Sequence, residues 1–325
     1  MNNQTDLSIV IVSWNAKRYL AECLESLAVY GSAWVREVIV VDNASTDGTC
    51  EMVVSRFPDV KLLRNESNLG FAKANNIGIA QCSGEYVCLV NSDVKLIHDC
   101  FTPMLNYMRN RPDVALLGPK MLGADLGVGR STMRFPTVWN SICRALGLDR
   151  VFKGSKLFGG QMVSDFDHEQ TRDVEVLNGW FLMVRRSVLG RVGLLDERFF
   201  MYGEDIDWCY RFHQAGQRTV FFAAAEAIHY GGASSANAPV RFQIEMYRAN
   251  CQYWKKHRGQ TAALLYLLII WLHQAVRLLG YLMLLPRRTS RSEAVFKMKK
   301  SLACMAWVIG ISSFQRGASS VSRVG

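Results

Sequence analysis

The chain has 325 residues, half of them hydrophobic and a fifth charged, and a formal net charge of +10. Its length allows one large domain with additions or two domains, and its composition is that of a globular protein with a substantial core. From Val240 to the end, fourteen Lys or Arg face two acids and accompany long apolar runs. This combination argues against a nucleic-acid partner and favours an anionic membrane surface.

The nine cysteines are scattered from Cys23 to Cys304 and form no C-x-x-C pair. The spacing therefore indicates neither a zinc site nor a disulfide framework, and a reducing cytosol suits it best. Residues 1–6 carry no basic segment that leads into a long apolar run, so we expect no secretory signal peptide there. The folded part of the chain is accordingly expected in the cytoplasm.

Strand-like and helix-like patterns alternate through the first ninety residues. Nearly continuous apolar runs are typical of strands that are covered on both faces of a parallel sheet. The alternation predicts right-handed βαβ units and a doubly wound sheet. The expected strands are 7–12, 37–42, 60–63 and 86–90, and the expected helices are 20–27, a helix from Thr46 on, and 70–82.

A polar cluster follows three of these strands, at residues 13–15, 42–47 and 91–93. Asx residues are common in ordinary turns, but ligands of doubly wound sheets bind beyond the carboxyl ends of the strands. Three clusters at successive strand ends therefore favour a binding site. The chain has neither a G-x-G-x-x-G after its first strand nor a P-loop motif, which argues against dinucleotide and P-loop sites. Asp93 could instead hold Mg²⁺ or Mn²⁺ bridging a diphosphate.

An acidic cluster follows Gly203 at the expected start of a helix. The helix dipole favours Glu204, Asp205 and Asp207 there and tends to keep them ionised, so one of them could act as a general base. Asp207 and Arg211 lie four residues apart, and we expect them to form a structural ion pair on an exposed helix face. Asp205 points to another side. The alternative is that all three are ordinary charges at a helix start.

The pattern loosens after Asp113. Residues 118–134 suggest a glycine-rich connection, and residues 140–172 a mobile flap or acceptor loop. Strand character returns over 174–184, with a break at Asn178 and Gly179, and again over 219–222. His229 ends the next strand before a glycine pair, where it is either a structural histidine or a contact to phosphate.

These motifs, in this order, resemble an inverting family 2 glycosyltransferase of the rhamnosyltransferase-like branch. The resemblance covers about residues 7–235. It implies a GT-A fold, which is an α/β fold with a Rossmann-like, doubly wound mixed sheet. The expected domains are a catalytic domain, 1–239, and a basic, apolar helical extension, 240–325. The motifs are Ile11-Val-Ser-Trp-Asn15, Val41-Asp-Asn-Ala-Ser-Thr-Asp47, Asn68-Leu-Gly-Phe-Ala72 with Asn75 and Asn76, Asn91-Ser-Asp93, Asn178-Gly-Trp-Phe181, Gly203-Glu-Asp-Ile-Asp-Trp208 with Arg211, and His229-Tyr-Gly-Gly232.

The resemblance also implies roles for single residues. Asp205 is implied as the catalytic base, and Asp42 as the contact to the pyrimidine base of the donor. Asp93 and His229 are implied as ligands of a divalent cation, Mg²⁺ or Mn²⁺. The D-x-D element reads Asn91-Ser-Asp93 here, so an asparagine oxygen or a water would replace its first acid. The nucleotide-sugar pocket is expected to include Ser13, Asn15, Asp42, Asn75, Asn76, Asn91, Ser92, Trp180 and Glu204.

The implied function is inverting transfer of a sugar from a nucleotide-diphosphate donor to a lipid-linked glycan or cell-surface polysaccharide precursor. The branch points to L-rhamnose from dTDP-rhamnose. Another UDP- or dTDP-hexose donor is an alternative, and so is a non-catalytic sugar-nucleotide-binding module at the membrane. Asp205 together with Asp93 argues against the module, because binding alone requires no base.

The apolar run 262–285 is long enough to span a bilayer. His273, Gln274 and Arg277 interrupt it on one face, and an arginine near the bilayer centre costs about 2.5–3.5 kcal/mol. A narrow polar stripe instead suits a helix that lies in the membrane interface. Basic residues over 287–300 and a second apolar run, 302–314, follow. We therefore expect peripheral attachment to the cytoplasmic face of the membrane; a true span, or a helix packed on the catalytic domain, is the alternative.

Overall fold

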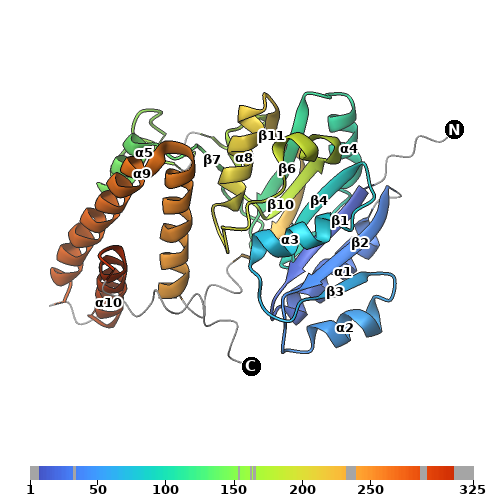
Figure 1. Cartoon of the computed structure of the whole chain (residues 1–325), viewed down its shortest axis with the longest axis horizontal. Helices are drawn as coiled ribbons and strands as arrows, with labels where there is room; N and C mark the ends of the chain where they lie inside the picture. Colours follow the sequence, from blue (N-terminus) through green and yellow to red (C-terminus); the bar gives the residue numbers. More distant parts are fainter. Residues whose placement is uncertain are drawn as a thin grey trace. The chain divides into compact units, whose positions relative to one another are not determined.

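The computed structural model describes residues 7–31, 34–152, 154–161, 163, 166–231, 239–285 and 291–310. The chain divides into two units (Figure 1). The first consists of Met1–Phe135 and Phe166–Asn237, and the second of Pro136–Asp165 and Ala238–Gly325. The contacts therefore group 136–165 with the C-terminal part, whereas the sequence pattern divides the chain at 239 alone. Gly232, Arg287, Arg288 and the end of the second apolar run, 311–314, lie outside the described residues.

The first unit is built on a mixed sheet with the strand order β3-β2-β1-β4-β10-β6-β11-β5, and β8 pairs with β11. Strands β1 to β4 run parallel, and β10 is antiparallel to both of its neighbours. This confirms the mixed α/β sheet. The strands are β1 (Leu7–Ser13), β2 (Val35–Asp42), β3 (Lys61–Arg64), β4 (Tyr86–Asn91), β5 (Val94–Leu96), β6 (Val114–Leu122), β8 (Arg172–Asp173), β10 (Phe181–Arg185) and β11 (Arg218–His229); β7 (Thr132–Met133) and β9 (Val176–Leu177) form a separate pair.

Helices cover both faces of this sheet. Ile9 and Ile11 of β1 share a buried cluster with Leu20 and Leu24 of α1. On the other face, a Cβ added to Gly78 of α3 would lie 2.3 Å from Val10 Cγ1, so only glycine permits this approach. Alternate residues of β1 thus point to opposite helical layers, which confirms the doubly wound arrangement. The helices are α1 (Lys17–Tyr30), α2 (Thr49–Arg56), α3 (Phe71–Ile79), α4 (Phe101–Arg109), α7 (Leu189–Val192) and α8 (Glu204–Gln214), with a 3-10 turn, η1, at Arg186–Val188.

Two strand predictions were wrong. Residues 118–122 belong to β6 instead of a glycine-rich connection, and β11 is one strand of 12 residues. Pro119 lies beyond Leu116 and Leu117, where β10 pairs with β6, so its missing N–H interrupts no bond to β10; on the other side it pairs in register with Phe222 of β11. In β11, a register shift between Phe222 and Glu226 hid the continuity from the sequence pattern.

The second unit is helical. Its elements are α5 (Val138–Ala145), α6 (Leu148–Val151), α9 (Pro239–Leu282) and α10 (Arg291–Val308). Helix α9 is interrupted at Gly259, whose φ of 85° is left-handed, and Trp254 and Tyr266 stack across the break. Ile244, Cys304 and Trp307 form the centre of its core. The predicted loop over 140–172 was wrong at α5, where Thr137 and Asn140 form a capping box that starts the helix.

The predicted C-terminal apolar helix is present as the second half of α9 (Figure 1). Among the described residues, α9 alone is long and apolar enough to cross a membrane, judged by length and composition. Only 22% of its most apolar window is buried. Most of this apolar surface is therefore left uncovered by the protein itself.

Candidate active site

The parallel strands bring the predicted polar clusters together. Ser13 pairs in register with Asp42, and Val12 pairs with Asn91. The last residues of β1, β2 and β4 therefore lie side by side at the carboxyl edge of the sheet, as expected for a ligand site of this fold.

Ser13 and Asp42 are buried at this edge with unused acceptor atoms. Asp42 is 2% exposed, and its Oδ2 accepts a hydrogen bond from the Ser45 N–H at 2.9 Å. Within the described part of the chain, neither Asp42 Oδ1 nor Ser13 Oγ has a hydrogen-bond partner. A buried polar atom without a partner costs about 1–3 kcal/mol. This edge is therefore suited to a ligand that carries N–H or O–H donors.

Asn91, Asp93 and His229 converge from β4, the turn after it and the end of β11. His229 Nε2 lies 3.1 Å from Asp93 Oδ1 and 3.4 Å from Asn91 Nδ2. Asn91 Oδ1 finds no hydrogen-bond partner in the described residues. The Trp180 ring stacks on His229 with centroids 5.4 Å apart. Carboxylate and amide oxygens are suitable ligands for Mg²⁺ or Mn²⁺, so Asp93 and Asn91 fit the expected cation, whereas the His229 imidazole is a ligand that softer metals prefer.

Asp205 lies in the first turn of α8, as predicted, and its carboxylate is held by the backbone. Its Oδ2 accepts from the Gly179 N–H at 3.0 Å, and its Oδ1 accepts from the Ile206 N–H at 2.8 Å. Burial nevertheless raises the pKa of Asp205 above its ordinary value, with these N–H groups acting in the opposite direction. The group is thus a fixed carboxylate with increased proton affinity.

Glu204 is 5% exposed, and its Oε2 meets no hydrogen-bond partner among the described residues. Burial raises its pKa well above the ordinary range, and the neighbouring Asp205 charge raises it further. The helix dipole was expected to lower the pKa of the acids in this turn, but the pKa values of Glu204 and Asp205 are shifted upward. Removal from water outweighs the dipole at this helix end.

Asp207 forms the predicted ion pair with Arg211, with Arg211 Nε 2.9 Å from Asp207 Oδ2. The expected exposed setting was wrong, because the Asp207 side chain is 0% exposed. Arg211 also donates to the carbonyls of Val192 and Leu194 at 2.6 and 2.7 Å. The pair therefore fastens α8 to the preceding loop and is structural.

The remaining predicted residues have protein partners or lie between strands. The Asn15 side chain accepts from the Thr46 N–H at 2.7 Å, and Asn75 donates to the carbonyl of Phe71 in its own helix at 2.9 Å. Asn76 is buried and exchanges hydrogen bonds with the backbone of Leu195 at 2.9 and 3.1 Å. These bonds give the three asparagines structural roles, and their contact to a nucleotide remains a prediction. Ser92 is half-buried between β4 and β5.

Sequence reasoning missed residues that complete the site. Gly179 supplies the N–H that holds Asp205, and Asn178 Oδ1 beside it is buried with no partner in the described residues. The Tyr230 N–H fixes the Asp93 carbonyl at 3.1 Å. The sequence marks Asn178 and Gly179 both as a break in strand character and as part of a family motif, but neither signal gives the role of the Gly179 N–H.

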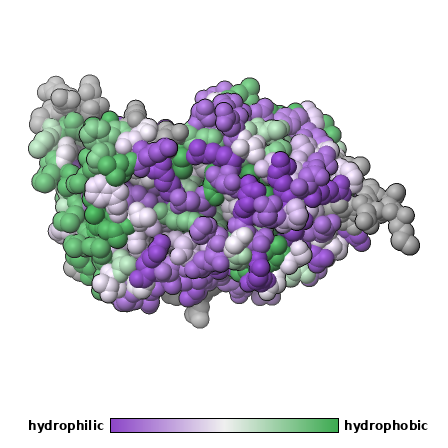
Figure 2. Space-filling view, turned by 90° about the horizontal axis from the view of Figure 1, so that it is seen from above, coloured by the Kyte–Doolittle hydropathy of each residue, from purple (hydrophilic) through white to green (hydrophobic). Residues whose placement is uncertain are grey.

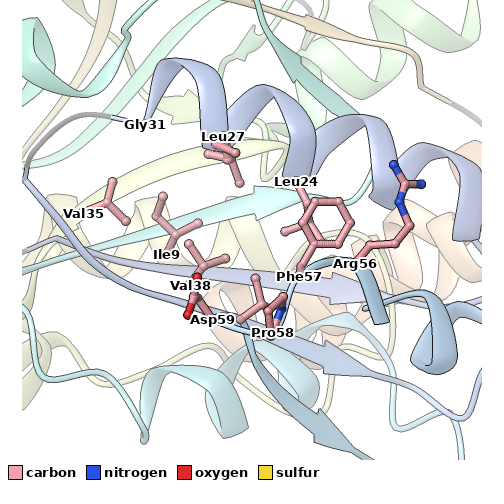
Figure 3. A pocket seen from close by; sticks show the side chains of 12 residues that line it. Ile9, Leu24, Leu27, Gly31, Val35, Val38, Arg56, Phe57, Pro58 and Asp59 are labelled. Atoms are coloured by element: carbon pink, nitrogen blue, oxygen red, sulfur yellow. The ribbon is translucent and has the colours of Figure 1, made fainter. Parts of the chain in front are cut away.

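A cavity of about 340 Å³ lies elsewhere in the first unit (Figure 3). It is enclosed by α1, the end of α2 and the early part of β2, and its wall is mostly apolar. None of the predicted site residues lines it. Leu24, Leu27, Val35, Val38 and Phe57 are among the side chains around it. The cavity is therefore separate from the polar edge of the sheet.

Comparisons with known proteins agree with this geometry. Residues 8–190 match the family model described as Glycosyl transferase family 2. The N-acetylglucosaminyl-diphospho-decaprenol L-rhamnosyltransferase of Mycobacterium tuberculosis (strain ATCC 25618 / H37Rv) is 32% identical over 248 residues, which cover 72% of this chain and 78% of that protein. The chain belongs to glycosyl transferase family 2. Rhamnosyltransferase WbbL of Escherichia coli (strain K12) is 26% identical over 234 residues, which cover 68% of this chain and 82% of that protein.

Solved structures confirm the fold. The mannosyltransferase PcManGT from Pyrobaculum calidifontis, solved with GDP-Man and Mn²⁺, superposes with a TM-score of 0.57 at 16% identity and covers 95% of this chain and 88% of that chain. S. aureus TarS 1–349 superposes with a TM-score of 0.52 at 16% identity, and the match covers 96% of this chain and 92% of that chain. The predicted GT-A fold and the rhamnosyltransferase-like branch of family 2 are thus both confirmed. The protein is a glycosyltransferase.

Proposed function

We propose that this glycosyltransferase transfers L-rhamnose from dTDP-rhamnose to a hydroxyl of a lipid-linked glycan, with inversion at the anomeric carbon. The observation that supports the inverting mechanism is the Asp205 carboxylate, which the Gly179 and Ile206 N–H groups hold in place, with Trp180 next to Gly179 stacked on His229. The donor and acceptor are inferred from the two rhamnosyltransferases, one of which is named for a diphospho-decaprenol substrate.

In this mechanism Asp205 removes the proton of the acceptor hydroxyl while that oxygen attacks the anomeric carbon. The bond from this carbon to the diphosphate oxygen breaks on the opposite face, and the nucleoside diphosphate leaves with its electron pair. One carboxylate at the reacting carbon is sufficient, in contrast to the acid and base pair of a glycosidase. Because burial raises the pKa of Asp205, its carboxylate is a stronger base towards the hydroxyl.

The donor would be held along the strand ends. In this proposal Asp42 Oδ1 and Ser13 Oγ would accept hydrogen bonds from the base and ribose, and Asp93, His229 and Asn91 would hold a divalent cation. No three His, Cys, Asp or Glu side chains converge within the described ranges, so phosphate oxygens would complete the ligand set. A bound Mg²⁺ or Mn²⁺ neutralises the charge of the leaving diphosphate.

The acceptor is proposed to reach the enzyme at the cytoplasmic face of the membrane, to which the C-terminal segment attaches peripherally. The apolar second half of α9 and its basic neighbourhood support this location. Charged and apolar contacts together give stable interfacial binding.

The donor is tested by incubating the enzyme and a lipid extract with dTDP-rhamnose, UDP-glucose, UDP-galactose or UDP-GlcNAc. We expect product with dTDP-rhamnose, with the anomeric configuration inverted in NMR spectra. Turnover of another donor without turnover of dTDP-rhamnose would identify a different hexosyltransferase of the same fold. Donor binding without any turnover in the presence of acceptor lipid and divalent cation would favour the non-catalytic module.

A further inference from the structure

Exposed apolar side chains are distributed very unevenly between the two units. Among the described residues, seventeen of the twenty-three exposed large apolar side chains belong to the second unit, which holds little more than a third of the chain. Figure 2 shows hydrophobic residues gathered at the left end, over this unit. Apolar patches of this kind on a folded protein mark an interaction surface.

The second half of α9 shows how this surface arises. Its polar residues are turned towards protein partners: His273 Nδ1 lies 2.8 Å from the Ala145 carbonyl, and Gln274 donates to the Tyr247 hydroxyl at 2.6 Å. The opposite stripe is apolar and at least half exposed along its length. The inner side also buries Ala263, Ile269 and Ile270, so this half of the helix is apolar on both sides, unlike an amphipathic helix on the surface of a water-soluble protein. The exposed stripe consists of Leu264, Leu268, Leu272, Val276 and Leu279.

The inserted segment 136–165 exposes apolar side chains as well. Trp139 is 45% exposed, and its indole N–H donates to the Leu157 carbonyl at 2.7 Å. Phe158 packs against Trp139 and against Phe152, which is 46% exposed. Half-exposed aromatic side chains whose polar atom has a partner are typical of the membrane interface. Leu146, Val151 and Leu157 are exposed by 63–72% beside them.

The two apolar areas are neighbours in space although they are far apart in sequence. Helix α5 packs on α9, and the hydrogen bond between Ala145 and His273 joins them. Leu146 follows Ala145, and Leu272 precedes His273, so exposed apolar residues flank both ends of this bond. The inserted segment and α9 therefore both expose apolar side chains next to the contact that joins them.

Charge indicates what covers this face. The second unit contains eighteen Lys and Arg against four Asp and Glu, a net charge of +14, which leaves −4 for the first unit. Arg144 and Arg150 are exposed on the inserted segment itself. A second copy of the chain would bring a second unit with the same net charge of +14 to the contact and would be repelled. An anionic lipid surface is attracted to it.

We propose that the face formed by α5, α6 and the second half of α9, here named the lipid face, inserts into the headgroup region of an anionic phospholipid bilayer. The segment 136–165, which interrupts the catalytic part in sequence, is thus a membrane-binding element in its own right. The inference extends the proposed membrane attachment of the C-terminal segment. It requires neither the proposed donor nor the proposed acceptor.

The test uses the full chain and vesicles of phosphatidylcholine with or without phosphatidylglycerol, in the absence of donor and acceptor. Leu146→Ser/Val151→Ser alters side chains that are 63% and 72% exposed. The matched control is Leu126→Ser/Val29→Ser in the first unit, where the side chains are 60% and 71% exposed. Co-sedimentation measures the partition coefficient, and the thermal unfolding midpoint in solution checks that each variant is folded.

We expect phosphatidylglycerol to strengthen binding, and the Leu146→Ser/Val151→Ser variant to lose about tenfold or more in partition coefficient through the apolar area no longer buried. The control variant should bind within about twofold of the unaltered chain, since its side chains lie outside the lipid face. Equal binding by both variants would overturn the proposal and leave attachment to α9 and α10 alone. No vesicle binding, with a dimer seen by light scattering, would assign the face to a second copy.

Discussion

The two units use polar and apolar side chains in opposite ways. In the first unit the central strands are apolar and buried, and at the carboxyl edge of the sheet Ser13 Oγ and Asp42 Oδ1 have no partner in the described residues. In the second unit the polar side chains His273 and Gln274 are turned inward and have protein partners, while the apolar stripe of α9 faces outward.

This contrast shows how each surface can be interpreted. A buried polar atom without a partner is unfavourable until a ligand supplies the missing hydrogen bond. An exposed apolar side chain is unfavourable until a partner or lipid removes it from water. The proposed ligands differ accordingly: a polar ligand for the first unit and a lipid surface for the second. Substitutions should separate these two requirements.

The largest effect is expected for Asp205→Asn. The amide keeps the shape of the carboxylate but cannot accept the proton of the acceptor, and general-base catalysis is typically worth about 10²–10⁴-fold. We expect kcat to fall by at least about two orders of magnitude, with donor affinity in equilibrium binding nearly unchanged. Near-normal kcat in this variant would remove Asp205 from the mechanism.

Asp207→Asn is the matched control two residues along the same helix. Asp207 is buried and paired with Arg211, so its substitution should lower the free energy of unfolding by about 3–5 kcal/mol, as for other buried pairs that lose one partner. The kcat of the molecules that remain folded should change little. Chemical denaturation and active-site titration measure the two quantities, and a catalytic collapse at unchanged stability would reverse the roles of the two acids.

The pH dependence tests whether burial governs the acids of α8. Since Asp205 acts as a base only when ionised and its pKa is raised, kcat should fall with decreasing pH through a pKa above the ordinary carboxyl value. The rate of a single turnover measured against pH gives this value. An acid limb at or below the ordinary carboxyl value would show that the site is more solvated than the structure indicates.

Burial of Glu204 also predicts how the stability of the folded protein depends on pH. Its pKa is raised in the folded state, so the folded protein binds this proton more tightly than the unfolded chain does. Stability from this group is present below the unfolded pKa and is lost as pH rises through the folded pKa. Glu204→Gln should therefore raise the unfolding midpoint relative to the unaltered chain at alkaline pH and have little effect at acidic pH. A variant that is less stable at both would contradict this.

The smallest effects are expected in the second unit. There an apolar substitution inside should destabilise the protein more than a polar substitution on the outer face. Gln274→Leu puts an apolar side chain inside but leaves the Tyr247 hydroxyl without its donor, which should cost about 1 kcal/mol of stability. Leu272→Ser puts a polar side chain outside and should change solution stability by less than about 0.5 kcal/mol. Thermal unfolding in solution compares the two. Greater loss for Leu272→Ser would mean that this face is covered by protein.

The amino-acid sequence determined the sheet and the position of its ligand edge. Runs such as those that form β1, β2 and β4 are local apolar patterns, and a parallel sheet brings their ends together whatever the details of packing. Asp42 and Asp93, which follow these strands, could therefore be proposed as site residues from the sequence, whereas Asp205 was proposed from the acidic start of α8 and the family resemblance. The pairing of Asp207 with Arg211 was also predictable, because it depends only on helical spacing.

Only the tertiary structure decided how these groups are surrounded. Desolvation depends on every element packed around a side chain, so the raised pKa values of Glu204 and Asp205 and the burial of Asp207 do not follow from the order of residues in α8. For the same reason, the polar stripe of α9 could not be assigned to the inside of the unit. Its partner, the carbonyl of Ala145, lies 128 residues earlier, and no local pattern records a contact at that separation.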